Sequence, residues 1–477
     1  MGVVMLRLVT VVVCLCVTGL VFAQGQSSSY TKDYQREALE IFDDIIAMRT
    51  AAGHGNVPAM AEYLADRFRD GGFDEEDIHI IPYTEDSGEE VASLVVRYRG
   101  NGLANKKPIL LLAHMDVVDA IRSDWVRDPY TLIEEDGFFF GRGTSDNKTG
   151  VAMLTTTFVR LQREGFTPTR DLIIAFTGDE ETTMETINSL VTEHRALVDA
   201  EFVLNTDAGG GYRDHDHEAV SYLLQAAEKT YITYELTIRN PGGHSSRPRA
   251  DNAIYELATV LKNIEAYRFP TRVNKVSEGY FREMSTLVEG ELGEAMAGFA
   301  KNPRDEDAQA VLETYPGEVG ATRTTCVATM LSAGHAENAL PQTATATVNC
   351  RIFPGVPATE VQAQLMQAAD NPNLEFSVGY EPVEGPMSSL REDVTATVGD
   401  AANALYGAVP VVPYMGAGAT DSLYTRFAGM PSYGVSGLFM RQEDMFAHGL
   451  NERVPVDSFF KALDYWHQVL GELGGQK

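Results

Sequence analysis

The sequence predicts an α/β protein: a mixed sheet covered by helices, into which a smaller α+β unit is inserted. Between residues 33 and 205, buried strand-like runs alternate with amphipathic helical periods, which is typical of a sheet covered on both faces. After Gly209-Gly210-Gly211 the expected order becomes strand-helix-strand-strand-helix-strand, that of a compact ferredoxin-like unit. We call this inserted unit the lid.

The expected boundaries follow from these changes of pattern. Residues 1–23 form a signal peptide, residues 30–212 and 386–477 form the two parts of the main domain, and residues 213–385 form the lid. No repeat or low-complexity linker separates them.

In the main domain, Ala38, Ile41, Phe42 and Ile45 recur at a helical period. The next helix starts at a proline and stops before two glycines, as helices commonly do. The expected elements are helices at 33–49 and 58–69, strands at 92–98 and 109–113, a helix after 141–150, a strand at 172–176, a helix at 185–197 and a strand at 202–205.

In the lid, the expected elements are a β-type run at 221–240, a helix at 252–267, a glutamate-rich helical insert at 275–318, a hairpin at 326–350, a helix at 359–369 and a strand at 374–378. This order alternates strands and helices within one compact unit, which predicts that the lid folds around its own core.

Composition and charge exclude several classes of protein. The chain has 477 residues, of which 44% are hydrophobic and 22% charged, as in globular proteins and unlike disordered, collagen-like or coiled-coil chains. Its 38 Lys and Arg against 68 Asp and Glu give a formal net charge of -30. A field of that sign repels phosphate backbones and anionic lipids, so neither nucleic acid nor a membrane surface is an expected partner.

The N-terminus has the pattern of a secretory signal. Arg7 precedes an apolar run that ends at Ala23, a small residue suited to signal-peptidase cleavage before Gln24. An uncleaved N-terminal anchor is the alternative. No other stretch is apolar and long enough to cross a bilayer. The protein is therefore expected to be exported, to the periplasm or outside the cell.

After cleavage two cysteines remain, in a chain bound for an oxidising compartment. Cys326 and Cys350 lie on two strand-like runs, and the pair is centred on Asn338 in the turn-rich stretch between them. Because paired positions of an antiparallel hairpin have a constant index sum, the two cysteines are expected to face each other. They either form a disulfide or remain two buried thiols.

Six short segments contain the candidate functional residues. They are His114-Met115-Asp116, Gly143-Thr144-Ser145-Asp146, Asp179-Glu180-Glu181, Asn205-Thr206-Asp207, Gly242-Gly243-His244-Ser245 and Ala447-His448-Gly449. Each is weak alone, but histidines and carboxylates at successive strand ends together predict a metal site. Imidazole and carboxylate ligands suit zinc, and cobalt or manganese could use the same ligands.

In order and spacing these segments resemble the di-zinc amidohydrolase family of aminoacylases, carboxypeptidase S and succinyl-diaminopimelate desuccinylase. The resemblance covers nearly the whole mature chain and implies a zinc-exopeptidase-like fold with two Zn²⁺ ions. It implies that His114 and Asp207 bind one ion, that Glu181 and His448 bind the other, and that Asp146 bridges them. It also implies a cis peptide bond after Asp146.

Three further residues receive catalytic or positioning roles. Glu180 resembles the family's general base, which takes a proton from the zinc-bridging water; the alternative is a purely electrostatic role. Asp116 is expected to accept the second imidazole N–H of His114. His244 matches the family histidine that stabilises the oxyanion, often in the active site of a partner subunit, so a homodimer through the lid is implied.

The resemblance also implies a substrate site. Arg351, paired with Asn338, would bind the terminal carboxylate of the substrate; a solvated strand residue is the alternative for Arg351. Thr420 and Asp421 lie in a degenerate version of the family's glycine-rich substrate loop. Glu452, after His448, is expected either to support a metal ligand or to lie on a helix surface.

The expected function is hydrolysis of the amide bond next to a C-terminal amino acid, in small peptides or N-acyl amino acids. A secreted di-zinc aminopeptidase is the nearest alternative, although it would need a carboxylate for the substrate's amine rather than Arg351. A non-catalytic metal-binding protein on the same fold would have lost a ligand or the base, and none is missing. A two-metal phosphatase would gain from several cationic clamps, and Arg351 is the only candidate.

Overall fold

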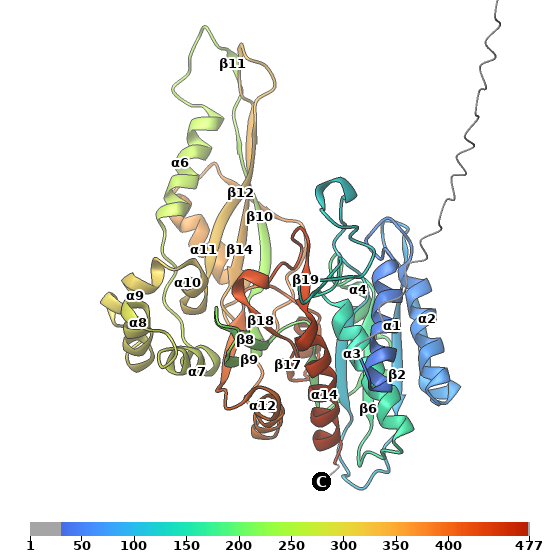
Figure 1. Ribbon diagram of the computed structural model, residues 1–477. Coiled ribbons are helices and arrows are strands. Elements are labelled where there is room, and N and C mark those ends of the chain that lie inside the picture. Colours follow the sequence, from blue (N-terminus) through green and yellow to red (C-terminus); the bar gives the residue numbers. More distant parts are fainter. Residues whose placement is uncertain (1–29, 476–477) are drawn as a thin grey trace, which may run out of the picture.

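The computed structural model describes residues 30–475, so the predicted signal peptide lies outside the described residues. The chain forms a helix-covered main sheet, and the sheet of the lid extends away from it (Figure 1). The expected fold class, an α/β body with an inserted α+β unit, is confirmed.

The main sheet has ten strands in the order β1-β2-β6-β3-β7-β17-β9-β8-β18, with β16 also paired to β9. Its centre is parallel, because β3 runs alongside β6 and β7 in the same direction. Both β3 and β6 are buried along their whole length, as expected for strands covered on two faces. The strands are β1 (Ile78–Thr84), β2 (Glu90–Tyr98), β3 (Ile109–His114), β6 (Leu172–Thr177), β7 (Phe202–Asn205), β8 (Gly210–Arg213), β9 (Ala219–Glu228), β16 (Val411–Gly416), β17 (Ser432–Gly434) and β18 (Phe439–Arg441).

Two apolar layers hold the helices to this sheet. Leu111 and Ile174 point to the layer under α1, α2, α3 and α14, whereas Leu110 and Ile173 point to the layer under α4 and α5. The alternation along each strand follows the period of two of β structure. The helices of the main domain are α1 (Asp33–Ala47), α2 (Val57–Asp70), α3 (Lys148–Arg163), α4 (Glu185–Thr192), α5 (Arg195–Val198), α12 (Glu392–Tyr406), α13 (Ser422–Phe427) and α14 (Val456–Leu473), with 3₁₀ turns η1 (Glu75–Asp77), η2 (Arg122–Asp124) and η3 (Gln442–Asp444).

A small antiparallel sheet of the main domain, in the order β19-β5-β4, joins the segment before the glycine-rich turn to the segment after His448. Its strands are β4 (Ile133–Glu135), β5 (Phe138–Phe140) and β19 (Arg453–Pro455). This pairing brings two distant parts of the chain together beside the predicted metal ligands.

The lid is an antiparallel sheet in the order β12-β14-β10-β15, with α6 and α11 packed on one face. Along β10, Ile232, Tyr234, Leu236 and Ile238 point to these helices and form their core. The elements of the lid are β10 (Thr230–Arg239), β11 (Gly243–His244), α6 (Ala253–Ala266), β12 (Thr325–Ala333), β13 (Ala339–Leu340), β14 (Thr343–Ile352), α11 (Ala358–Ala369) and β15 (Glu375–Val378).

The helical insert also forms as expected. It contains α7 (Lys275–Met284), α8 (Gly290–Lys301), α9 (Glu306–Glu313) and α10 (Pro316–Thr322), which share a small core around Phe281, Met296 and Phe299. Helix α7 packs against β16 of the main sheet, so the insert lies beside the base of the lid and leaves the lid's far end uncovered (Figure 1).

Three local expectations differ from the structure. The β-type run 221–240 is two strands in two different sheets, so the sheet changes at Lys229, later than the boundary expected after residue 212. Strand β1 was not expected, because its polar residues and Pro82 hide an edge strand. The expected helix 185–197 is divided into α4 and α5 around His194, which lies outside helical geometry.

Cys326 and Cys350 form a disulfide across the β12–β14 ladder, where they are direct partners with Cα atoms 4.1 Å apart. The hairpin is paired as the constant index sum predicts, up to a bulge after Ala328. The disulfide therefore fixes the register of β12, the edge strand of the lid.

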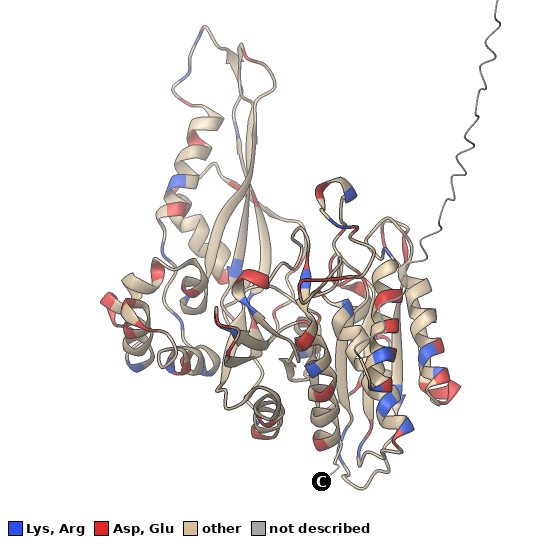
Figure 2. Ribbon diagram, viewed as in Figure 1, with Lys and Arg blue, Asp and Glu red and all other residues tan. Residues whose placement is uncertain are grey.

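In the described residues, no helix is both long and apolar enough to span a bilayer. Charged side chains lie along the outer helices of the main domain, whereas the strands of the lid are mostly uncharged (Figure 2).

Candidate metal centre and active site

The polar residues at the strand ends meet at one edge of the main sheet. In the order β6-β3-β7, Glu180 and Glu181 follow the first strand, His114 ends the second, and Asp207 follows the third. Because these strands are parallel, their carboxyl ends lie on the same edge. Sequence reasoning could predict this part of the site, since it needs only the strand limits.

Asp146 and His448 reach the same edge from loops. Asp146 ends the glycine-rich turn before α3, and the peptide bond Asp146–Asn147 is cis, which confirms the bond implied by the family resemblance. His448 lies in the loop before β19 and has a φ of 61°, in the left-handed region that few histidines adopt.

The five predicted ligands form two groups that share Asp146. His114, Asp146 and Asp207 offer ligand atoms within 4.8 Å of one another, and so do Asp146, Glu181 and His448. Nε2 of His114 lies 2.8 Å from Oδ1 of Asp146, and Nε2 of His448 lies 3.1 Å from its Oδ2. Each group supplies three nitrogen or oxygen donors, which fits a divalent ion such as zinc with a position left open.

The electrostatics of the site favour a bound cation. Hydrogen bonds to Asp146 and Glu181 raise the pKa of His448 to about 10. Burial raises the pKa of Asp207 to about 7, and the negative charge of Asp146 contributes in the same direction. The closely spaced carboxylates therefore favour positive charge between them. A bound divalent ion would supply that charge and reduce the repulsion between the carboxylates.

Asp116 positions the two glutamates. Its Oδ1 accepts the backbone N–H of Glu180 at 3.2 Å, and its Oδ2 accepts that of Glu181 at 2.9 Å. The expected bond from its carboxylate to His114 is replaced by a shorter one: Nδ1 of His114 lies 3.0 Å from the backbone oxygen of Asp116 and 3.5 Å from Oδ1. The tautomer of His114 is thus fixed by a carbonyl, with the carboxylate behind it.

Glu180 differs from the neighbouring carboxylates, because its side chain has no polar partner among the described residues. It is 8% exposed, and its carboxyl group makes no hydrogen bond or ion pair with any residue from 30 to 475. Burial, followed by the negative charge of Asp207, raises its pKa well above the ordinary value. A buried carboxyl group with a raised pKa next to ligand groups is suited to accept and return a proton.

Glu452 belongs to the site, which settles the two expectations for it in favour of support. It is fully buried, and its Oε2 accepts a hydrogen bond from Nη1 of Arg142 at 2.6 Å. Its Oε1 accepts the backbone N–H groups of Ser145 at 2.7 Å and Asp146 at 3.0 Å. Nη2 of Arg142 in turn donates to the backbone oxygen of His448 at 3.2 Å. Sequence reasoning missed Arg142, because no local pattern links it to residues 310 positions away.

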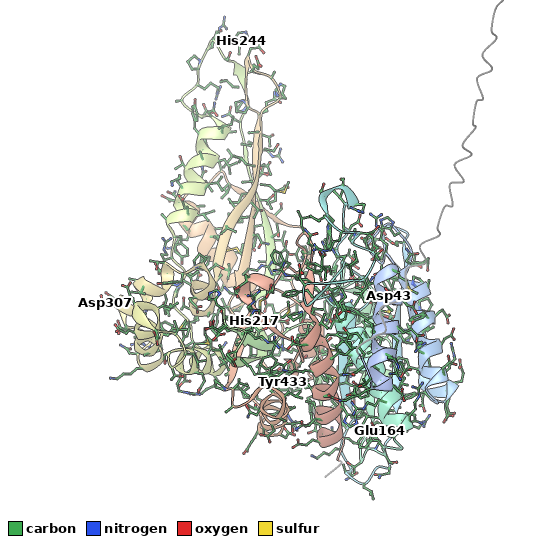
Figure 3. All side chains as sticks on the ribbon, viewed as in Figure 1. Asp43, Glu164, His217, His244, Asp307 and Tyr433 are labelled. Atoms are coloured by element: carbon green, nitrogen blue, oxygen red, sulfur yellow. A yellow bond between two sulfur atoms is a disulfide. The ribbon has the colours of Figure 1, made fainter. Side chains whose placement is uncertain are left out.

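His244 and Asn338 lie together but away from the metal groups. His244 lies at the far end of the lid, well separated from the main domain (Figure 3). Its strand pairs with β13, and the backbone oxygen of Asn338 accepts the N–H of Ser245 at 2.9 Å. Within one chain, the structure does not bring either residue to the ligands.

Arg351 lies where the lid meets the main domain. Its Nη1 donates to the backbone oxygen of Ala417 at 3.1 Å, and its guanidinium stacks 4.6 Å from the ring centre of Tyr231. It is therefore not a solvated strand residue but a partly buried cation at the junction of the two domains.

Thr420 and Asp421 differ from the expectation that they bind substrate directly. They are only 7% and 2% exposed. Thr420 donates to Oε1 of Glu228 at 2.6 Å, and Asp421 accepts a hydrogen bond from the hydroxyl of Thr177. Their side chains therefore connect the loop 416–422 to strands of the main sheet. These contacts restrict the conformations of a glycine-rich loop.

Fold and site together point to a hydrolase whose candidate metal ligands, histidines and carboxylates, lie at the carboxyl edge of an α/β sheet. Residues 110–472 match the sequence profile of Peptidase family M20/M25/M40, and the chain belongs to this family. The family resemblance read from the sequence is confirmed.

Relatives and solved structures agree with this assignment. The chain is 28% identical to the "N-fatty-acyl-amino acid synthase/hydrolase PM20D1" of Xenopus tropicalis, over 77% of this chain and 72% of the relative. It is 24% identical to the "Probable carboxypeptidase S-like 2" of Dictyostelium discoideum, over 80% and 74%. The M20 family metallo-carboxypeptidase Sso-CP2 from Sulfolobus solfataricus shares its fold, with a TM-score of 0.68, 18% identity, and coverage of 91% and 98%.

Proposed function

We propose that this M20 hydrolase uses two zinc ions to cleave the amide bond next to a C-terminal amino acid, in small peptides or in N-acyl amino acids. The observation that carries the proposal is the pair of ligand groups sharing Asp146, with the unpaired carboxyl group of Glu180 beside them. Cobalt or manganese could replace zinc in a site of these donors.

His114, Asp146 and Asp207 would hold one metal ion, and Asp146, Glu181 and His448 would hold the other; when bound, the ions would supply Lewis acidity toward the attacking water and the scissile carbonyl group. Glu180 accepts the proton of the water and passes it to the leaving nitrogen. Asp116 keeps Glu180 in place through the backbone N–H groups that its carboxylate accepts. The carboxyl group of Glu180 has no other polar partner among the described residues. It is therefore free to turn from the attacking water to the leaving nitrogen.

Arg351 supports recognition of the C-terminal rather than the N-terminal end of the substrate. Its guanidinium lies at the junction of lid and main domain, and Ala417 occupies only one of its donors with a backbone oxygen. A substrate carboxylate could take the place of that neutral acceptor and form two hydrogen bonds with the guanidinium group. An aminopeptidase would instead need an acidic group at this position to bind the substrate's amine.

A library of free peptides and N-acyl amino acids, offered to the zinc-loaded mature protein, tests the proposal. Mass spectrometry identifies the bond that is cut, and the Glu180→Gln variant is the control for contaminating hydrolases. We expect C-terminal amino acids to be released by the native protein alone. Release of N-terminal residues would instead establish an aminopeptidase, and no cleavage despite bound zinc would favour a binding protein.

We further propose a homodimer through the lid. Its edge strand β12 exposes Val327, Met330 and Leu331, whose exposed fractions lie between 60% and 69%. An unpaired edge strand with apolar side chains is a ready surface for a second copy. Such a dimer would also give His244 a role, since it lies far from the ligands of its own chain (Figure 3).

Mixed dimers of two inactive variants test that role. When His244→Ala and Glu180→Gln chains are co-expressed, each mixed dimer regains one complete site if His244 acts in the partner's site. We therefore expect activity in the mixed sample that neither variant shows alone. If His244 acts within its own chain, no mixed dimer is active and mixing restores nothing.

We also propose that the protein is exported to the periplasm or outside the cell. The signal-like residues 1–23 and the Cys326–Cys350 disulfide support export, because structural disulfides persist in oxidising compartments.

A further inference from the structure

A cavity of about 210 Å³ opens beside the metal ligands and has no part in the mechanism described so far. Asp146 and Asp207 form part of its wall, so any group inside it lies next to the metal centre. Its lining also includes the apolar side chains of Leu438, Met440, Met445 and Ala447. We call it the side cavity.

The side cavity lies on the opposite side of His114 from Glu180. Along the edge of the main sheet, Glu180 follows β6, His114 ends β3 and Asp207 follows β7. Part of the cavity wall comes from Gly211 of β8 and Met440 of β18, two strands that lie further along in the same direction. A substrate carbonyl at the metal centre therefore has Glu180 on one side and the side cavity on the other.

This order separates the two halves of a substrate. The leaving nitrogen must come within hydrogen-bond reach of Glu180 in order to receive its proton. The group on the other side of the carbonyl carbon then points away from Glu180, toward Asp207 and the side cavity. The cavity is thus placed for the acyl half of the substrate.

The walls define the chemistry of that half. Leu438, Met440, Met445 and Ala447 give an apolar surface, and methionine side chains adapt to ligands of different shape. The lining residues include no Lys, Arg or His, and the two acidic ones lie at the metal centre. The volume is below the roughly 300–1,000 Å³ of pockets for drug-sized ligands, so it suits one side chain or short acyl group.

We propose that the side cavity is the binding site for the acyl group of the substrate, and that it selects an uncharged, apolar group of about amino-acid side-chain size. The inference rests on the proposed function and specifies its substrate. A carboxylated acyl group is disfavoured, because the cavity offers it no cation.

A series of N-acyl amino acids with one common amino acid tests the proposal. We expect kcat/KM to rise about tenfold or more from acetyl to hexanoyl, since added methylenes gain contacts in an apolar pocket. Succinyl has the length of butanoyl with a terminal carboxylate, and we expect it to be cleaved at least about tenfold less well than butanoyl. Equal values along the series, or succinyl at the level of butanoyl, would overturn the proposal.

Variants locate the effect. Met440→Trp, which fills the cavity, is expected to lower the ratio of hexanoyl to acetyl kcat/KM by about tenfold. Leu438→Ala, which enlarges it, is expected to shift the best substrate to a longer acyl group. Met366→Trp on α11 of the lid is the matched control, because this methionine is 51% exposed and does not line the cavity. If Met440→Trp lowers kcat/KM equally for all acyl groups, the acyl group does not occupy the cavity.

Binding is measured separately from turnover. In a zinc-loaded Glu180→Gln background, calorimetry with the same acyl series gives affinities without hydrolysis. An affinity that rises from acetyl to hexanoyl and is lost in Met440→Trp supports the side cavity even if the native protein cleaves none of these compounds. Cleavage without any dependence on the acyl group supports the proposed function and overturns the side cavity.

Discussion

Glu180→Gln is expected to lower kcat by about 10²–10⁴-fold, the usual contribution of a general acid and base. The amide keeps the size of the side chain and the backbone N–H that Asp116 accepts, but it cannot take a proton from water. Zinc content, measured by atomic emission after dialysis, is expected to stay at the native level, because Glu180 belongs to neither ligand group.

The matched control for this variant is Glu193→Gln, an exposed glutamate after α4 in the same domain. It is expected to retain native kcat. Loss of zinc in Glu180→Gln would show that the residue is a ligand, and near-native kcat would leave the reaction without its proposed base.

Glu452→Gln is expected to weaken zinc binding about 10–100-fold, the usual effect of losing a partner that orients metal ligands. The carboxylate of Glu452 accepts the N–H of Asp146, and through Arg142 it holds the carbonyl group of His448. Those two residues are far apart along the chain and meet in one ligand group. An amide would present an N–H to an N–H donor and release this link.

The expected measurement is the zinc dissociation constant by competition with a chelator, at a temperature well below unfolding. Glu443→Gln is the matched control, because Glu443 lies in the same loop region with its side chain 43% exposed. A native dissociation constant in Glu452→Gln would contradict the positioning role.

Stability needs its own control, because the change leaves the guanidinium of Arg142 buried without its partner, at a cost of about 3–5 kcal/mol. The double variant Arg142→Met/Glu452→Leu removes both charges and is expected to recover part of the melting temperature, because the N–H groups of Gly143, Ser145 and Asp146 still lose their acceptor. Its zinc affinity is expected to stay low, since neither side chain can hold Asp146 or His448. Recovery of both properties would reduce Glu452 to a structural role.

Much of the site could be predicted from strand limits. His114, Glu181 and Asp207 stand at the ends of consecutive buried strands, and parallel strands end at one edge whatever the rest of the fold does. Asp146 and His448 needed the family resemblance, because each lies in a loop whose path depends on contacts with distant segments.

The lid shows the opposite case. Its elements could be predicted one by one, including the register that joins Cys326 to Cys350, since a hairpin is local in sequence. Where its sheet begins could not. The chain leaves the main sheet at Lys229 without any turn residue, because one continuous β-type run serves two sheets.

The sequence by itself determined the fold class, the order of the elements and the chemistry of the ligands, because periodicity and residue type are properties of short segments. Tertiary structure alone decided three other features: the buried link from Glu452 through Arg142 to His448, the burial of Thr420 and Asp421, and the distance of His244 from its own metal centre. These features depend on which distant segments come into contact. A contact between residues hundreds of positions apart is set by the packing of whole elements, and it leaves no local pattern along the chain.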